Sequence, residues 1–350
     1  MKTIRLGTRP SELALWQANW TREALEKNGA NVEIVKIATS GDVDRSEAIV
    51  NIGAQGVFTK EIQRALLNNE IDVAVHSLKD LPIEKIPGLR LVAAPERADC
   101  RDAFVSNKYA SIDELPAGAV LGTSSMRRKS MALRYAAKLY PDAKAPVWDV
   151  RDIRGNVGTR LRKLDDGEYD ALVLASAGLE RLDAADRITS YLERPDFLPA
   201  VGQGALGLET RDDDPETIKQ VEKLIDRSAF LSVLAERALL AELQGGCLIP
   251  VGAYGRLLDL EDDFELLALD AQILSFDGLQ SFSTTSVQIF DPNKFDGPLP
   301  FETQKKLAEM LGKGAARALL DQGATELVDE IRRVRDERSE QLRKRTPESR

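Results

Sequence analysis

Cysteine and histidine are scarce in this chain of 350 residues, which contains two cysteines and a single histidine. Two cysteines far apart in the sequence cannot form a disulfide framework, so we expect a reducing compartment, the cytoplasm. With one histidine, a zinc site would need an unusual set of carboxylate ligands, and we predict no metal site. No apolar run approaches the ~20 residues that span a bilayer, so we expect no membrane association.

Positive charge is also in deficit, because the net charge of the chain is −9 at pH 7. Nucleic-acid binding needs a basic surface, so nucleic acid is not an expected partner. The exception is the region 120–164, which has eleven Lys or Arg residues against three Asp or Glu. This excess indicates an anionic partner, and ordinary surface ion pairs, each worth about 0–1 kcal/mol, are the alternative.

Short strand-like segments alternate with helical patterns through the first half of the chain. Strands are expected at residues 3–7, 32–38, 71–75, 89–93, 103–106, 120–122, 147–150 and 171–175. The helices between them predict an α/β protein with largely parallel sheets. One of these helices begins at Ser11, and its residues Leu13, Trp16, Trp20 and Ala24 form an apolar stripe that we expect to lie in the core.

The pattern breaks near residues 97–101 and 195–199, which suggests that the chain leaves a first lobe and later returns to it. Such a crossing creates a cleft between two lobes, a common site for small anions. A helix over 215–243 and a hairpin of strands 264–274 and 280–289 predict a small α+β third domain. The predicted division is 1–99 with 198–214, then 100–197, then 215–330, and a charged tail, 331–350, that is a frayed helix or disordered.

Polar residues follow the buried-looking strand 71–75 in the order His76, Ser77, Leu78, Lys79, Asp80. Ligands of open α/β sheets bind beyond the carboxyl ends of the strands, so this placement suits a site. Asp80 is the candidate acid or base, because neighbouring Lys79 favours its ionised form. An ion-paired loop carboxylate is the alternative interpretation.

Three further strand ends in the second lobe carry hydroxyl groups or arginines. The residues concerned are Thr123, Ser124, Ser125, Arg127, Arg128, Arg154, Arg160 and Arg181. Hydroxyls and N–H groups at a helix N-terminus bind oxyanions, and arginine binds carboxylates with bonds worth roughly 1.5–3 kcal/mol where water is excluded. We therefore predict a polycarboxylate ligand. Phosphate esters are an alternative, although the chain lacks a Walker loop and a clear dinucleotide fingerprint.

Cys247 lies in a loop that Gly245 and Gly246 precede and Pro250 follows. Glycines remove steric bulk and proline limits helical continuation, so another molecule could approach the thiol closely. This loop suits a reactive or covalently modified thiol, and it equally suits a small buried cysteine.

Together, these segments resemble the hydroxymethylbilane synthase, or porphobilinogen deaminase, family. The matching segments are residues 7–18, 76–82, 102–106, 122–128, 154–160, 198–209 and 245–252, in order along the chain. The resemblance implies three domains. Two would be doubly wound mixed-sheet lobes similar to type II periplasmic binding proteins, and the third would carry Cys247.

The resemblance also implies an activity, that of a transferase of tetrapyrrole biosynthesis acting as a monomer. Cys247 would hold a dipyrromethane cofactor through a thioether, and four porphobilinogen molecules would be added to it head to tail. Water would then release hydroxymethylbilane. Each addition would expel ammonia, and Asp80 would stabilise the resulting cationic electrophile and manage proton transfers.

The resemblance assigns cofactor or substrate binding to a larger set of residues. They are Arg9, Ser11, Ser77, Lys79, Thr123, Ser124, Ser125, Arg127, Arg128, Arg154, Arg160 and Arg181. The sequence departs from the family pattern at Gln55, where many relatives have lysine in a lid loop, and in an apparent insertion at 290–300. The rival hypothesis is a two-lobed anion-binding module without chemistry, and the intact mass of the protein distinguishes the two.

Overall fold

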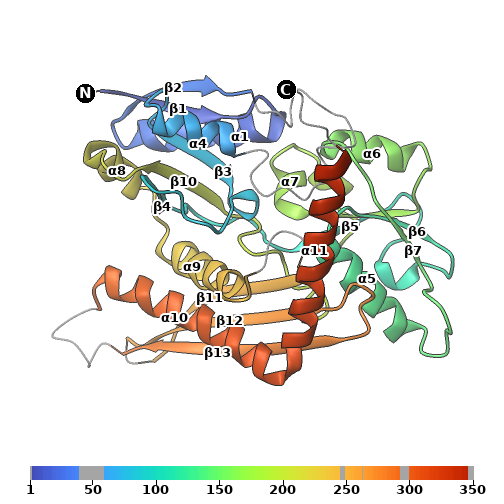
Figure 1. Ribbon diagram of the computed structural model, residues 1–350. Coiled ribbons are helices and arrows are strands. Elements are labelled where there is room, and N and C mark those ends of the chain that lie inside the picture. The colour runs from blue at the N-terminus through green and yellow to red at the C-terminus, as the bar shows by residue number, and fades with distance from the viewer. Residues whose placement is uncertain (1, 39–58, 245–248, 262, 292–298, 346–350) are drawn as a thin grey trace.

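The computed structural model describes residues 2–38, 59–244, 249–261, 263–291 and 299–345 (Figure 1). For residues 335, 336 and 338–345, it describes the backbone alone. Cys247 and Gln55 lie outside the described residues, and so does most of the apparent insertion at 290–300.

The first lobe is built on a mixed five-stranded sheet with the order β2-β1-β3-β10-β4 (Figure 1). Its strands are β1 (Thr3–Thr8), β2 (Asn31–Lys36), β3 (Val73–Ser77), β4 (Leu89–Ala93) and β10 (Leu206–Arg211). The first three are parallel, and β10 is antiparallel to both of its neighbours. The helices that pack on this sheet are α1 (Glu12–Lys27), α4 (Lys60–Leu67) and α8 (Pro215–Glu222).

The second lobe repeats this arrangement with the strand order β7-β6-β8-β5-β9. Its strands are β5 (Asp102–Val105), β6 (Val120–Gly122), β7 (Asp149–Arg151), β8 (Ala171–Ala175) and β9 (Ser190–Leu192). Its helices are α5 (Met126–Leu139), α6 (Val157–Asp165) and α7 (Ser176–Glu180). In each lobe the antiparallel strand, β10 or β5, is the one that arrives from the other lobe.

Two connections join the lobes, and they lie side by side. Ala98 N–H donates to Gly204 O at 3.3 Å, and Arg97 Nε donates to Gln203 O at 2.9 Å. The pattern breaks at 97–101 and 195–199 fall within these connections. The crossing places the two lobes side by side, one on each side of the paired connections (Figure 1).

The third domain is an antiparallel sheet in the order β11-β12-β13, with helices on one face. Its elements are β11 (Val251–Asp259), β12 (Glu265–Leu274), β13 (Ser281–Phe290), α9 (Arg227–Glu242) and α10 (Phe301–Leu319). Leu274 pairs with Ser281 and Glu265 with Phe290, which confirms the predicted hairpin. The chain is therefore an α/β protein of two mixed-sheet lobes and a small C-terminal domain, as the sequence predicts.

The charged C-terminal segment is helical in this structure, because α11 (Thr325–Arg345) continues from the third domain. Its first turns join the core of that domain through Leu327, Val328 and Ile331. Arg332 Nη2 donates to Leu243 O at 3.2 Å, next to the last turn of α9. No helix in the described ranges is both long and apolar enough to cross a bilayer.

The predicted helix over 215–243 is two helices in the structure. The first, α8, packs on the first-lobe sheet, and its residues Ile218 and Val221 join that core. The second, α9, begins at a cap, since the Asp226 side chain accepts a hydrogen bond from Ala229 N at 2.7 Å. An N-cap aspartate satisfies an otherwise unpaired N–H group and starts a new helix.

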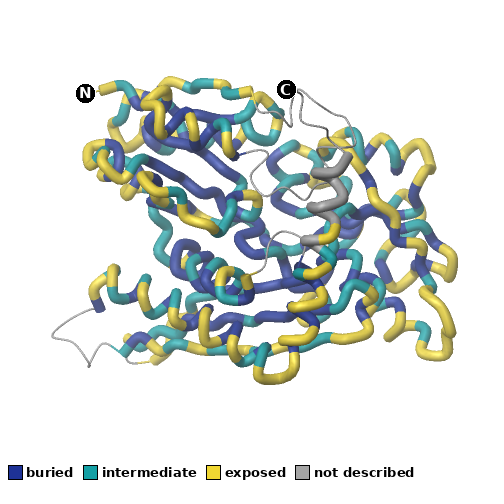
Figure 2. The backbone as a smooth tube through the Cα atoms, in the orientation of Figure 1, coloured by how far each residue is buried: buried dark blue, intermediate teal, exposed yellow. Residues whose placement is uncertain are grey.

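The predicted core stripe of α1 is wrong, because the buried face of this helix consists of Gln17, Ala18, Thr21 and Leu25. Burial is concentrated in the strands at the centre of each lobe (Figure 2). Trp16 retains 37% of its surface exposed. Polar residues can occupy the buried face because their groups are satisfied: Thr21 Oγ1 donates to Gln17 O at 2.9 Å.

Candidate active site

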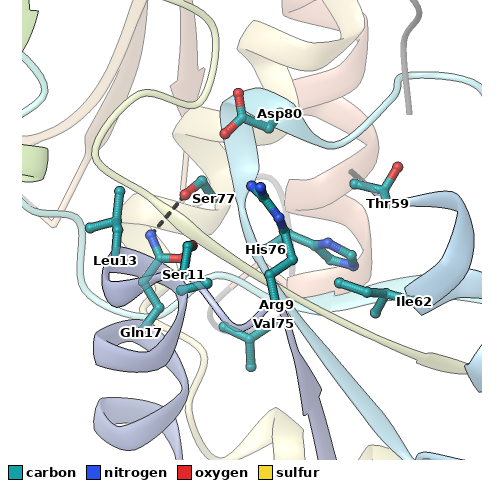
Figure 3. Close-up of a pocket in the computed structure, with 11 residues that line it drawn as sticks. Arg9, Ser11, Leu13, Gln17, Thr59, Ile62, Val75, His76, Ser77 and Asp80 are labelled. Atoms are coloured by element: carbon teal, nitrogen blue, oxygen red, sulfur yellow. Dashed lines mark hydrogen bonds between the residues drawn. The ribbon is translucent and has the colours of Figure 1, made fainter. Parts of the chain in front are cut away.

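A cavity opens at the carboxyl end of β3 in the first lobe, and four of the predicted site residues line it (Figure 3). Arg9 and Ser11 lie between β1 and α1, Ser77 ends β3, and Asp80 closes the 3₁₀ turn Leu78–Asp80. Because β1 and β3 are parallel neighbours, their carboxyl ends meet at the same sheet edge. The order of strands thus gathers side chains from two distant segments.

Gln17 also lines this cavity, although it is not among the site residues predicted from the sequence. Its Nε2 donates to Ser77 Oγ at 2.7 Å, which fixes the serine hydroxyl relative to α1 (Figure 3). Gln17 lies one residue after Trp16, and the apolar spacing of the helix predicts that Trp16, not Gln17, lies on the inward face.

Lys79 and Asp80 interact electrostatically with arginines of the opposite lobe. Burial and then the charge of Arg128 lower the pKa of Lys79 to about 8. Burial, followed by the charges of Arg128 and Arg154, lowers the pKa of Arg160 to about 10, and Asp80 opposes that shift. Asp80 of the first lobe therefore lies close enough to cations of both lobes to interact with them electrostatically.

Arg127 and Arg128 lie at the carboxyl edge of the second-lobe sheet, next to the connections between the lobes, where both bind Asp102. Arg127 Nη1 donates to Asp102 Oδ2 at 2.7 Å and Arg128 Nε donates to Asp102 Oδ1 at 2.9 Å. Gln203 Nε2 adds a bond of 2.7 Å to the same carboxylate. Burial opposes ionisation of Asp102, but the charges of Arg127 and Arg128 outweigh it and lower its pKa below the ordinary range. The carboxylate that these arginines bind here is the protein's own.

The hydroxyl residues between β6 and α5 make local hydrogen bonds. The Ser125 side chain caps α5 by accepting from Arg128 N, and Ser124 Oγ donates to Ile153 O. Thr123 is buried, and its Oγ1 accepts from Ser125 N at 3.3 Å. These bonds hold the turn at the N-terminus of α5, where backbone N–H groups point toward the cleft end of the sheet.

The remaining predicted arginines lie at the other strand ends of the second lobe. Arg160 Nε donates to Gly155 O at 2.9 Å, and half-exposed Arg154 lies 3.4 Å from an Asp152 oxygen. Arg181 Nη2 donates to Gly204 O at 2.7 Å, and its guanidinium lies 5.4 Å from the ring centre of Trp16. Burial lowers the pKa of Arg181 to about 10. This cation–π contact between lobes explains why Trp16 is outside the core.

A buried ion pair that the sequence did not reveal joins the three domains at the hinge. Glu236 on α9 binds Arg97 at 2.6 Å. The same carboxylate accepts from Gly202 N at 2.7 Å and Gly255 N at 2.8 Å. Arg97 and Glu236 are 139 residues apart, and their contact depends on the docking of the third domain.

The flanks of the Cys247 loop are held next to the hinge. The preceding helix ends in Leu243, and β11 begins at Val251 after the loop. Ala253 N–H donates to Pro199 O at 2.9 Å, which attaches β11 to the return connection between the lobes. The described residues contain no group of three or more potential metal ligands.

Two α/β lobes of matching strand order, joined by paired connections, place the chain in the class of two-lobed α/β proteins. Similar solved structures include three bacterial proteins. The first is a pheromone cOB1 precursor/lipoprotein of the YaeC family from Enterococcus faecalis, with 15% identity, a TM-score of 0.42, and coverage of 65% of this chain and 92% of that chain. The second is a periplasmic substrate-binding protein from Coxiella burnetii, with 13% identity, a TM-score of 0.40, and coverage of 63% of this chain and 91% of that chain. The third is immunogenic lipoprotein A from Vibrio vulnificus, with 11% identity, a TM-score of 0.40, and coverage of 63% of this chain and 94% of that chain.

Family models identify the chain more narrowly. Residues 4–219 match "Porphobilinogen deaminase, dipyromethane cofactor binding domain", and residues 230–321 match "Porphobilinogen deaminase, C-terminal domain". The chain belongs to the porphobilinogen deaminase family.

Proposed function

We propose that this protein deaminates porphobilinogen and joins four molecules of it head to tail, releasing ammonia and hydroxymethylbilane for tetrapyrrole biosynthesis. The observation that carries the proposal is the shared cleft of Asp80, Lys79 and Arg160, in which the pKa values of the two cations are lowered. Such a site suits a substrate that carries carboxylates and develops positive charge during the reaction. We also propose that the enzyme acts as a cytoplasmic monomer.

The cleft residues fit a dipyrromethane cofactor, whose carboxylates would supply the missing negative charge. Lys79 and Arg160 would bind carboxylate groups, because burial and then the charges of neighbouring arginines lower their pKa values, and a bound carboxylate would stabilise both cations. Cys247 would carry the cofactor through a thioether, from a loop whose flanks adjoin the hinge. When bound, this group supplies the free pyrrole carbon from which the chain grows.

Asp80 would stabilise the positive charge that develops on porphobilinogen as its ammonia leaves. Its carboxylate is exposed to the cleft, so a substrate ring can reach it. Arg9, Ser11 and Ser77 line the same cavity and would orient the substrate, with Gln17 holding the serine hydroxyl. Preorganised groups aimed at a developing charge lower the barrier without reorganisation.

The second lobe would hold the acetate and propionate groups of the growing chain. Arg154, Arg160 and Arg181 lie at its strand ends, and the N-terminus of α5 offers N–H groups beside Thr123, Ser124 and Ser125. Arg127 and Arg128 would add to the positive potential from beside the hinge, with Asp102 fixing their positions.

The proposal is tested by Asp80→Asn, which keeps the shape of the side chain and removes its charge. We expect this variant to retain the cofactor, detected as added mass on the chain, and to release ammonia from porphobilinogen about 10² to 10⁴ times more slowly. Asp196→Asn, an exposed carboxylate of the second lobe that pairs with Lys138, is the matched control and should keep normal turnover.

Near-normal turnover by Asp80→Asn would remove Asp80 from this role. A wild-type chain that carries no added mass, and releases no ammonia, would instead support an anion-binding module without chemistry. Cys247→Ser should lose the added mass altogether.

A further inference from the structure

The single histidine of the chain lies in a buried polar cluster beside Asp80, and the function proposed above does not use it. His76 Nε2 lies 3.2 Å from Glu209 Oε2, and Gln63 Nε2 donates to both oxygens of that carboxylate at 3.2 and 3.1 Å. His76 is 4% exposed and Glu209 is 6% exposed. The cluster joins the end of β3 to β10 and α4.

The imidazole also lines the cavity that contains Arg9, Ser77 and Asp80. Figure 3 shows the ring between the side chains of Arg9 and Ile62. Because His76 and Asp80 line one cavity, a substrate bound there can meet a second ionisable side chain.

The contact with Glu209 determines which ring nitrogen can accept a proton. An ionised carboxylate only accepts hydrogen bonds, so Nε2 carries the hydrogen and donates it to Glu209. Nδ1 then presents its lone pair, and no hydrogen bond from a described residue occupies it. Histidine held in one tautomer by a buried carboxylate is the arrangement that enables it to act as a base.

The hydrogen bonds to Glu209 differ in kind from those to the buried carboxylate of Asp102. Asp102 is bound by two guanidinium groups, whereas the hydrogen bonds to Glu209 come from an imidazole and an amide. The nearby Arg237 donates its hydrogen bonds to Leu81 O and Pro82 O. A proton on His76 would convert the Glu209 contact into an ion pair, which stabilises the imidazolium.

We propose that His76 is a further catalytic residue, which accepts the proton that each condensation releases. This inference rests on the proposed function. When a new porphobilinogen is added, its C–N bond breaks and ammonia leaves with the bonding electrons. The preceding substrate-derived pyrrole supplies the electron pair of the new C–C bond. The C–H bond of that ring carbon then breaks, its electrons restore the aromatic ring, and the proton passes to His76 Nδ1.

The imidazolium afterwards gives its proton to the released ammonia, so charge and atoms balance with no redox partner. This assignment divides the work between two side chains. Asp80 can remain ionised and stabilise the cationic substrate while His76 takes the proton. Glu209 fixes the tautomer and is a positioning residue.

The kinetic test compares His76→Gln and Glu209→Gln with the wild type in single-turnover addition of porphobilinogen. A glutamine at 76 can still donate to Glu209 but cannot accept a proton, so we expect addition to slow by about 10² to 10³. Glu209→Gln should slow it by about tenfold, because the base remains but its imidazolium loses the ion pair. The porphobilinogen concentration at half-saturation should change less than about threefold in both variants, since neither change removes a carboxylate-binding group.

Thr217→Ala is the matched control for a loss of stability in the same lobe. Thr217 is also buried, and its hydroxyl donates to Asp214 at 2.8 Å. Asp214 binds Arg211, which donates to Ile71 O before the amino end of β3, whereas the cavity lies at the carboxyl end. We expect normal addition rates from this variant.

A second readout needs no turnover, because one histidine gives unambiguous imidazole resonances in the ¹⁵N NMR spectrum of untagged protein. Without substrate, we expect the Nε2–H tautomer with Nδ1 unprotonated. In Asp80→Asn, which turns over slowly, added porphobilinogen should shift the Nδ1 resonance more than that of Nε2.

Addition rates of His76→Gln within about threefold of the wild type would overturn the inference, as would an Nδ1–H tautomer in the free protein. If the wild type itself adds no porphobilinogen, the proposed function fails. If the wild type reacts and His76→Gln reacts equally well, only the role of His76 fails.

Discussion

The arginines that bind Asp102 beside the hinge and Arg160 on α6 belong to the same lobe, but they differ in how their charge is balanced. Arg127 and Arg128 share a fully buried carboxylate of the protein. Arg160 donates to a backbone carbonyl, and burial, followed by the charges of Arg128 and Arg154, lowers its pKa to about 10. We infer that the first group maintains the fold and that the second is kept for a ligand.

The largest effect that this comparison predicts is a loss of stability in Asp102→Asn. The substitution leaves two buried guanidinium groups without their counter-charge, and breaking a buried ion pair in this way costs about 3–5 kcal/mol. Urea denaturation followed by tryptophan fluorescence measures the free energy of unfolding. A change below about 1 kcal/mol would show that Asp102 does not support the fold as we infer.

The next largest effect is expected for Arg160→Leu, and it should appear in activity instead of stability. Loss of one charge-assisted bond to a carboxylate, worth roughly 1.5–3 kcal/mol, should slow chain elongation by about 10- to 100-fold. Native gels or intact masses should then reveal an accumulated early intermediate. An unaltered distribution of intermediates, or a large drop in unfolding free energy, would show that Arg160 does not serve ligand binding in the way that distinguishes it from Arg127 and Arg128.

A smaller, pH-dependent effect is expected at Lys79. Burial and then the charge of Arg128 lower the pKa of this side chain from an ordinary 10.5 to about 8. Lys79 loses its charge as the pH rises through about 8, so KM for porphobilinogen should rise by up to about tenfold between pH 7 and 9.5. The unfolded chain keeps this proton up to about pH 10.5, so stability without ligand should rise with pH in the same window. Lys79→Arg should flatten the KM profile, and an unchanged profile would exclude Lys79 as a carboxylate-binding group.

The smallest effect is expected for Arg187→Ala, which removes a more exposed ion pair of the same lobe. Arg187 Nη2 lies 2.6 Å from Asp165 Oδ1. Ion pairs in contact with solvent contribute about 0–1 kcal/mol, so both the unfolding free energy and the turnover should stay near those of the wild type. If Arg187→Ala lost as much unfolding free energy as Asp102→Asn, the contribution of an ion pair to stability would not depend on its burial.

The placement of Ser77 and Asp80 could be predicted from local sequence, whereas Arg9 and Ser11 were assigned by the family resemblance. Ser77 and Asp80 lie at or just after the end of a strand whose apolar pattern is clear, and parallel strands bring such ends to one edge. The hairpin of the third domain was predictable for the same reason, since alternating residues flank an Asp-Gly turn.

Contacts between distant segments could not be predicted in this way. Asp102 meets Arg127 and Arg128 because β5 crosses from the first lobe and pairs with β8, an order of strands that no local pattern encodes. Glu209 reaches His76 because β10 returns 133 residues later to lie beside β3. The buried face of α1 was missed because Gln17 and Thr21 are polar, and only their partners in the fold make burial favourable.

The account depends most on the reaction of porphobilinogen with a chain bound in the cationic cleft, and intact mass spectrometry tests it most directly. Wild-type protein given a few equivalents of porphobilinogen should show a series of masses, each heavier by one porphobilinogen less one ammonia. Arg160→Leu should stop early in that series. A single unchanged mass for the wild type, under conditions in which the substrate is stable, would contradict the account.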